Sequence, residues 1–286
     1  MADAPLSTAL GRYPGTAALI DGHMTSPLFA LAPVEVKPIS RAFAPMVRAL
    51  RFDVSEMAIV TFLMAKAWAK DLVLLPVAVV ARFQEAALLC RADGSVSGPG
   101  DLRGKRVGVR AYSQTTGLWL RGRMQDAFGI APEDNAWVTF EDAHVAEYGD
   151  PPFVARAAPG EDMLAMLRSG ALDAAIFGND VPADAGLRTV FDDPAAAGRD
   201  FVAAHGFVPV NHLVVVRGAL VRERPDVVAA LTAMLREAAG EAGLPHGRPA
   251  LEPALALAIR YAREQGLLPR DMAVDEAWDG LPAGIG

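Results

Sequence analysis

The sequence lacks several features that define common classes of protein. Its 286 residues include a single cysteine, Cys90, so no intrachain disulfide can form, and this cysteine lies in an apolar run typical of a buried strand. The longest apolar run, Leu72–Ala81, contains Pro76 and is much shorter than the roughly 20 residues that cross a bilayer. These absences argue against a disulfide-stabilised scaffold and predict that the chain does not insert into a membrane.

Positive charge is in deficit, with 27 basic residues against 34 acidic ones and a net charge of −7. No run or stripe of basic residues stands out, so we expect no nucleic-acid partner. Residues 1–15 have neither the early positive charge nor the apolar segment of a secretory signal. As the sequence stands we expect a cytoplasmic protein, or a periplasmic one if a leader has been removed.

Signatures of nucleotide, metal and serine-hydrolase chemistry are missing as well. There is no Walker A sequence, no G-x-G-x-x-G, no H-E-x-x-H and no G-x-S-x-G. His144 and Glu147, spaced i and i+3, are on their own a weak pair of metal ligands. We therefore expect no metal site and no cofactor.

The chain is rich in the patterns of an α/β protein, with 52% hydrophobic residues and strands that alternate with helices. This alternation predicts a mostly parallel sheet, in which ligands bind beyond the carboxyl ends of strands. We expect strands over residues 34–39, 72–80, 86–90, 106–109, 136–140, 173–177 and 208–216, after a first strand and short helix within 6–20. We expect helices over residues 41–50, 56–70, 161–168, 225–239 and 254–265.

Residues 101–129 form the most informative stretch. A short β-rich run, Arg106–Val109, leads into a polar cluster and then a helical pattern that ends at Gly129. The cluster consists of Tyr112, Ser113, Gln114, Thr115 and Thr116. Because the first N–H groups of a helix lack partners, this arrangement indicates an anion-binding helix start. The structural alternative is that Ser113 only caps the helix.

Further polar residues stand where a strand ends or a helix begins. Ser55 is a natural N-cap for the helix expected at Glu56, and both residues are candidates to touch a ligand. Tyr13 and Asn179 follow other strands. Asn211 and His212 open an apolar strand, where a histidine is either satisfied within the core or a general acid or base at a cleft. Within the helix of the anion-binding stretch, Trp119 is expected in the core and Arg121 in solvent.

Several segments, in order along the chain, are similar to a known family. They are FDVSEM (52–57), DLRGKRVGV (101–109), AYSQTTGLWLRG (111–122), GALDAAI (170–176), GFVPVNHLVVVRG (206–218) and RYAREQGLLPRDMAVDE (260–276). Together they resemble the 4,5-dihydroxyphthalate decarboxylase-like family, which has the fold of the type 2 periplasmic binding proteins. The resemblance implies an α/β clamshell of two lobes with two hinge crossings. One lobe would hold residues 1–88 and 211–286, the other residues 89–210, and the ligand would lie between them.

The sequence departs from the family pattern in two places. After the strand at 72–80 the family carries Ser-Arg and then Arg-His, whereas this chain keeps only Arg82 as a basic residue and has Gln84-Glu85 in place of the pair. The family's Gly-Asp-Tyr-Asp has become Gly-Arg-Tyr-Pro at residues 11–14. A phthalate needs several donors for its two carboxylates, so these departures suit a ligand with fewer negative charges.

Two hypotheses follow. The first is a cofactor-independent decarboxylase of a hydroxylated aromatic acid, in which His212 donates the proton, Glu56 polarises a ring hydroxyl, and Arg82 with the amides of residues 113–116 holds a carboxylate. The second is a non-catalytic solute-binding protein for a small organic anion, which would have a permease as its partner. Either function needs a small carboxylate ligand, and either is compatible with a homo-oligomer.

Overall fold

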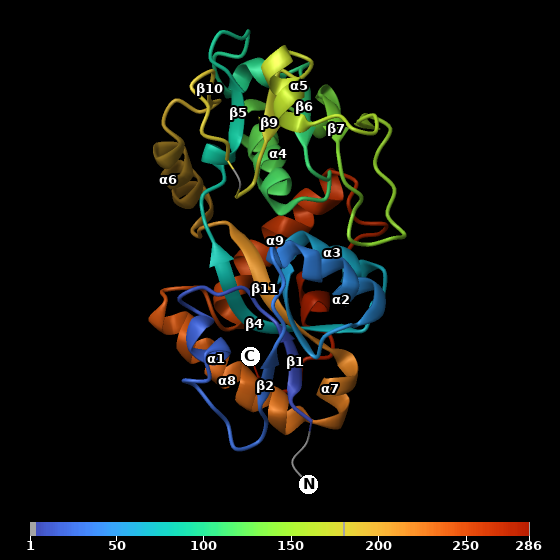
Figure 1. The fold of residues 1–286 in the computed structure, drawn as a ribbon, viewed down its shortest axis with the longest axis vertical. Helices are drawn as coiled ribbons and strands as arrows, with labels where there is room; N and C mark the ends of the chain where they lie inside the picture. The colour runs from blue at the N-terminus through green and yellow to red at the C-terminus, as the bar shows by residue number, and fades with distance from the viewer. Residues whose placement is uncertain (1–3, 180, 286) are drawn as a thin grey trace.

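The computed structural model describes residues 4–179 and 181–285, which form two lobes stacked along the long axis of the molecule (Figure 1). Each lobe is built on one sheet. The first lobe carries a sheet with the order β2-β1-β3-β11-β4, and the second carries one with the order β10-β5-β9-β6-β7-β8. The strands are β1 (Leu6–Ala9), β2 (Leu31–Pro33), β3 (Val54–Ala58), β4 (Leu72–Ala81), β5 (Leu88–Arg91), β6 (Arg106–Val109), β7 (Ala136–Thr139), β8 (Val154–Arg156), β9 (Ala174–Ile176), β10 (Leu187–Thr189) and β11 (Val210–Arg217).

Helices cover both sheets. They are α1 (Ala17–Ile20), α2 (Phe43–Ala49), α3 (Ile59–Ala67), α4 (Thr115–Phe128), α5 (Met163–Ser169), α6 (Pro194–His205), α7 (Gly218–Glu223), α8 (Pro225–Glu241) and α9 (Arg248–Glu264). Short 3₁₀ turns are η1 (Ile39–Ala42), η2 (Glu85–Ala87), η3 (Pro99–Leu102), η4 (Pro132–Asp134) and η5 (Val274–Trp278). None of the helices within the described ranges combines the length and apolar character needed to cross a bilayer.

The first sheet explains the long apolar run in the sequence. Strands β4 and β11 are buried almost throughout because α8 packs on one face of the sheet, while α3 and α9 pack on the other. A strand covered on both faces reads as continuous apolar sequence rather than as an alternation. Strand β11 runs antiparallel to both of its neighbours, β3 and β4, and this pairing brings its first residues beside the ends of those two strands.

The chain crosses between the lobes twice, after β4 and before β11. The two crossings are tied together by a reciprocal amide pair, in which Gln84 Nε2 donates to Asn211 Oδ1 at 2.8 Å and Asn211 Nδ2 donates to Gln84 Oε1 at 3.2 Å. Beside them, Glu85 and Arg123 form an ion pair at 3.1 Å. Helix α9 adds a third link, since it packs against α3 of the first lobe and α4 of the second. The domain limits after residues 88 and 210 stay a prediction.

The two-lobed α/β fold was correctly predicted, but several elements differ from expectation. Both sheets are mixed rather than mostly parallel. The helix expected over 56–70 begins only at Ile59, because residues 54–58 pair as β3 with β11. The strand expected over 34–39 is absent from that segment, and β2 precedes it. Helix α6 was not predicted.

Candidate active site

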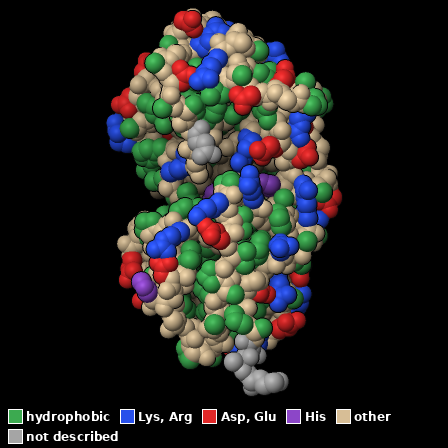
Figure 2. Space-filling model, in the orientation of Figure 1, with side chains coloured by type: hydrophobic (Ala, Val, Ile, Leu, Met, Phe, Trp, Pro, Cys, Tyr) green, Lys and Arg blue, Asp and Glu red, His purple; other side chains and the backbone are tan. Residues whose placement is uncertain are grey.

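A cleft lies between the lobes, and Figure 2 shows the surface hollowed there, with basic and histidine side chains at the notch. It encloses about 140 Å³, close to the roughly 150 Å³ of the engineered apolar cavity that holds benzene. A single aromatic ring therefore fits, with its substituents directed to polar walls. The first lobe and the crossings contribute Pro38, Ile39, Ser40, Phe43, Ala58, Thr61, Val80, Arg82, Asn211 and His212. The second lobe contributes Arg110, Ser113, Gln114, Thr115, Thr116, His144, Phe177, Gly178 and Asn179.

His212 projects into this cleft from the start of β11. It pairs with Ala58 of β3 on one side and Val80 of β4 on the other, at a point where the β11–β4 register is irregular. Such irregularities re-aim side chains and are common beside active sites. The imidazole is 14% exposed, and its Nδ1 lies 2.5 Å from Glu56 Oε1. The Nε2 atom is thus the ring nitrogen left for a ligand.

Glu56 lies behind His212 and is fully buried. Its Oε2 accepts the backbone N–H of Gly11 at 2.7 Å, and its Oε1 also accepts the Tyr13 hydroxyl at 3.1 Å. Burial and the neighbouring carboxylate raise the pKa of Tyr13, so the phenol stays a donor. These contacts fix the carboxylate where it orients His212 and offsets the positive charge of a protonated ring.

Three residues predicted to touch the ligand from this wall are placed differently. Glu56 does not line the cleft and is not positioned to polarise a ligand hydroxyl. Tyr13 contacts Glu56 rather than the cleft. Ser55 is buried within β3, as its second residue, and its hydroxyl donates to the carbonyl of Glu56, so it caps no helix. The helix start that faces the cleft belongs to α3 and is marked by Ala58 and Thr61.

The opposite wall is the start of α4, which lies within the 101–129 stretch. The N-cap residue is Gln114 rather than Ser113, and no side chain caps the helix. Among the described residues, the N–H groups of Thr115, Thr116 and Gly117 meet no acceptor. The buried Thr115 Oγ1 and Gln114 Oε1 also have no partner in the described chain. Open amides at the positive end of a helix are suited to an anion.

Two arginines add positive charge to the cleft. Arg82 donates to Thr116 Oγ1 at 3.3 Å, and no carboxylate of the described residues lies within 4 Å of its guanidinium. Burial lowers the pKa of Arg82, which is the cost of holding a cation away from water. Arg110, at the carboxyl end of β6, pairs with Glu141 at 3.4 Å. Arg110 was missed from the sequence, although its position after a central strand could have indicated it.

A second histidine, His144, also lines the cleft. Its Nδ1 lies 2.8 Å from Thr61 Oγ1, and the Phe43 ring packs edge-on against both His144 and His212. Burial, with the positive charges of Arg110 and Arg48, lowers the pKa of His144 to about 4, so it is neutral near pH 7. It belongs to no metal cluster: in the described parts of the chain, no three His, Cys, Asp or Glu side chains group as metal ligands.

The remaining predicted residues divide between the cleft and the core. Asn179 is exposed at the cleft, whereas the Asn211 amide is largely taken up by Gln84. Tyr112 is buried and packs edge-on against Trp137, so it does not line the cleft. Its neighbour in space is Arg121, whose guanidinium lies 3.9 Å from the Tyr112 ring centre.

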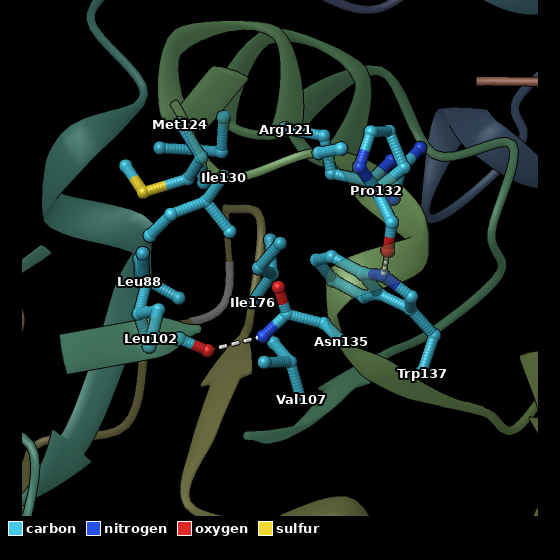
Figure 3. Close-up of a pocket in the computed structure, with 12 residues that line it drawn as sticks. Leu88, Leu102, Val107, Arg121, Met124, Ile130, Pro132, Asn135, Trp137 and Ile176 are labelled. Atoms are coloured by element: carbon cyan, nitrogen blue, oxygen red, sulfur yellow. Dashed lines mark hydrogen bonds between the residues drawn. The ribbon is translucent and has the colours of Figure 1, made fainter. Parts of the chain in front are cut away.

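Arg121 was expected in solvent but is 1% exposed. Its Nε donates to Gln265 Oε1 at 2.8 Å and its Nη2 to the Tyr112 carbonyl at 2.6 Å. Figure 3 shows it at one end of a small cavity beneath α4, lined mainly by apolar side chains and by Asn135. This cavity holds about 10 Å³, room for one water and for no ligand. Trp119 is in the core, as expected, and donates to the Val210 carbonyl at 2.9 Å.

Comparison with known proteins identifies relatives by sequence. No model of a protein family matches the chain. The 4,5-dihydroxyphthalate decarboxylase of Comamonas testosteroni is 28% identical over 249 residues, which cover 81% of this chain and 73% of that protein. The protein of the same name from Pseudomonas putida is 29% identical over 184 residues, which cover 60% of this chain and 69% of its own.

Solved structures share the fold at low identity. The periplasmic aliphatic sulphonate binding protein SsuA of Escherichia coli superposes with a TM-score of 0.64 at 16% identity, covering 97% of this chain and 92% of its own. The desulfurization enzyme DSZB superposes with a TM-score of 0.56 at 16% identity, covering 98% of both chains. A binding protein and an enzyme thus share this fold, so the fold alone does not distinguish between the two functions. The chain is thus similar in sequence to two proteins named 4,5-dihydroxyphthalate decarboxylase and has the two-lobed fold of the periplasmic binding proteins.

Proposed function

We propose that this protein is a decarboxylase that removes CO₂ from a hydroxylated aromatic carboxylic acid bound in the cleft. The observation that carries the proposal is the His212–Glu56 pair, which faces the anion-binding start of α4 across a space of ring size. Passive binding of an anion has no need of a histidine held by a buried carboxylate. The relatives named 4,5-dihydroxyphthalate decarboxylase support the same reaction class.

The wall of the cleft formed by the start of α4 and Arg82, here called the anion-binding wall, holds the ligand. One carboxylate accepts hydrogen bonds from the open amides of Thr115 and Thr116 and from the Arg82 guanidinium. Arg110 offers a second cationic contact in the same cleft. With Arg82, it gives the cleft two cationic side chains, although the basic pair is missing at residues 84–85.

The reaction needs one proton and a ring rich in electrons. Protonated His212 delivers the proton on Nε2 to the ring carbon that bears the leaving carboxylate, while the ring hydroxyl donates electron density toward that carbon. The bond to the carboxylate then breaks, its electrons restore the aromatic ring, and CO₂ leaves. His212 is left neutral, with Glu56 holding Nδ1, and takes a new proton from solvent.

Solute binding without catalysis is the second candidate, favoured by the similarity of the fold to SsuA. It requires the same anion-binding wall but gives the His212–Glu56 pair no role. The cellular location would follow the function, with the cytoplasm for the enzyme and the periplasm for a binding protein. We place the enzyme first because only catalysis gives the His212–Glu56 pair a role.

The test is incubation of the purified protein with a panel of hydroxybenzoates, hydroxyphthalates and phthalate, with CO₂ release measured beside ligand-induced thermal shift. The proposal predicts CO₂ from at least one hydroxylated acid that also shifts the melting temperature. Stabilisation by these acids with no CO₂ from any of them would favour the binding protein instead.

A matched variant tests the anion-binding wall. Arg82→Met removes a cation that has no acid partner in the described chain, so the variant is expected to be at least as stable as the wild type. Its affinity for the productive acid should fall by roughly 10- to 100-fold, since a charge-assisted contact is lost. Unchanged affinity in this variant would show that Arg82 does not contact the ligand.

A further inference from the structure

The segment that carries His144 reaches from one lobe to the other. It joins β7 to β8 of the second lobe, yet it is attached to the first lobe beside α2 and α3. Arg48 of α2 donates to the carbonyls of Ala143 at 2.8 Å and His144 at 2.9 Å. Lys70 forms an ion pair with Glu147 at 2.5 Å. These contacts hold the backbone of His144 at the cleft independently of any ligand.

The ring of His144 is positioned as firmly as its backbone. Its Nδ1 is engaged by Thr61 Oγ1 at 2.8 Å, and its ring makes a T-shaped contact with Phe43, whose ring centre is 5.5 Å away at 88°. The same Phe43 ring lies 5.2 Å from that of His212 at 85°. Phe43 therefore contacts two imidazoles that both line the cleft, each with Nδ1 already engaged and Nε2 left for the ligand.

The two histidines differ in their electrostatic surroundings. Beside His212 stands the carboxylate of Glu56, whereas His144 has only a hydroxyl, from Thr61, and faces the positive charges of Arg110 and Arg48. The environment of His144 therefore disfavours protonation of the ring. Because its pKa is lowered, His144 is a poor base for a phenol. Its chemistry is limited to a hydrogen bond.

We propose that His144 is a specificity-determining residue that recognises a ring hydroxyl of the ligand through Nε2. When Thr61 donates to Nδ1, Nε2 carries a proton and donates; when Nδ1 donates to Thr61, Nε2 accepts. A hydroxyl group satisfies either arrangement because it both donates and accepts. The carboxylates of the ligand are served by Arg82, Arg110 and the start of α4. This inference deepens the proposed function and takes its choice of ligands from it.

The experiment measures binding, so that it does not depend on turnover. Calorimetric titrations with 4,5-dihydroxyphthalate, 4-hydroxyphthalate and phthalate are made on the wild type, His144→Phe and Thr61→Val. His23→Gln, a change at an exposed histidine, is the matched control. We expect His144→Phe to weaken binding of the hydroxylated ligands by roughly 10- to 100-fold while changing the affinity for phthalate less than about threefold.

The informative quantity is the ratio of the affinity for a hydroxylated ligand to the affinity for phthalate. A change in this ratio indicates that His144 recognises the hydroxyl, whereas a purely structural role would weaken all ligands equally. Thr61→Val, which keeps His144 but releases Nδ1, should reduce the ratio in the same direction by a smaller factor. Equal weakening of all three ligands by His144→Phe would overturn the proposal, as would an unchanged ratio in both variants. A reduced ratio in His144→Phe, found together with a wild type that releases no CO₂, would support His144 while contradicting the decarboxylase. A wild type that releases CO₂, found together with a ratio that His144→Phe does not change, would support the decarboxylase and contradict the proposed role of His144.

Discussion

Glu56→Gln is expected to lower the rate of decarboxylation strongly while changing the stability of the fold only slightly. Gly11 N–H can only donate, so the remaining oxygen of the new amide is held at Gly11, where Glu56 Oε2 now lies. The amide NH₂ is then directed at His212 Nδ1 and the Tyr13 hydroxyl, which are both able to accept. This arrangement fixes His212 as the neutral tautomer with its proton on Nε2.

The expected magnitudes follow from these contacts. Shape and the Gly11 bond are kept, so the free energy of unfolding should fall by only about 1–2 kcal/mol. The rate should fall much further, because a neutral imidazole is a weak acid. General acid catalysis is worth roughly 10²- to 10⁴-fold, or about 3–5 kcal/mol of activation free energy.

The assay pairs urea denaturation with the rate of CO₂ release at saturating ligand. Tyr13→Phe is the control, since it removes one hydrogen bond to Glu56 but leaves the carboxylate, and it should lower the rate less than about tenfold. A Glu56→Gln variant that folds and keeps its rate within about threefold of the wild type would refute the role of the pair.

Three further predictions concern stability. His144 has a pKa of about 4 in the fold against 6.5 when free; the unfolded chain therefore takes up the proton first, and the stability present above pH 6.5 is lost as pH falls toward 4. Urea denaturation at pH 7 and pH 4.5 should show that His144→Gln reduces this loss by on the order of 2 kcal/mol. Arg123→Ala leaves Glu85 buried without its ion-pair partner and should cost about 3–5 kcal/mol by urea denaturation, whereas an effect below about 1 kcal/mol would contradict the buried pair. Gly122→Ala places a Cβ 2.3 Å from the Tyr261 ring, where α4 meets α9, and thermal denaturation should show a loss of about 1–3 kcal/mol; an unchanged melting temperature would contradict the close packing of these helices.

What the sequence could predict was carried by local pattern. The strand, polar turn and helix of residues 101–129 are contiguous, so the helix start of α4 that lines the cleft follows from neighbours in the chain. His212 was a candidate because a histidine at the start of an apolar strand is unusual. The order of the family segments predicted the two lobes.

What failed depends on contacts between distant residues. Residues 56–58 precede a strongly apolar helix and were predicted as its first turn after an N-cap at Ser55, but pairing with β11, more than 150 residues away, holds them in a strand. Arg121 looks solvated on a helix, and only the docking of Gln265 and the Tyr112 ring buries it. His144 lies in a loop whose position is set by Arg48 of the other lobe. No local pattern carries that information.

The most direct test of the central claim is the behaviour of His212→Gln toward 4,5-dihydroxyphthalate, with binding and CO₂ release measured on the same preparation. The proposed mechanism predicts wild-type release of CO₂, and a variant that binds within about threefold of the wild type but turns over roughly 10²- to 10⁴-fold more slowly. The control, His23→Gln, should match the wild type in both measurements. A His212→Gln variant that turns over as fast as the wild type would contradict the role of His212 as proton donor, and a wild type that binds the acid and releases no CO₂ would contradict the decarboxylase.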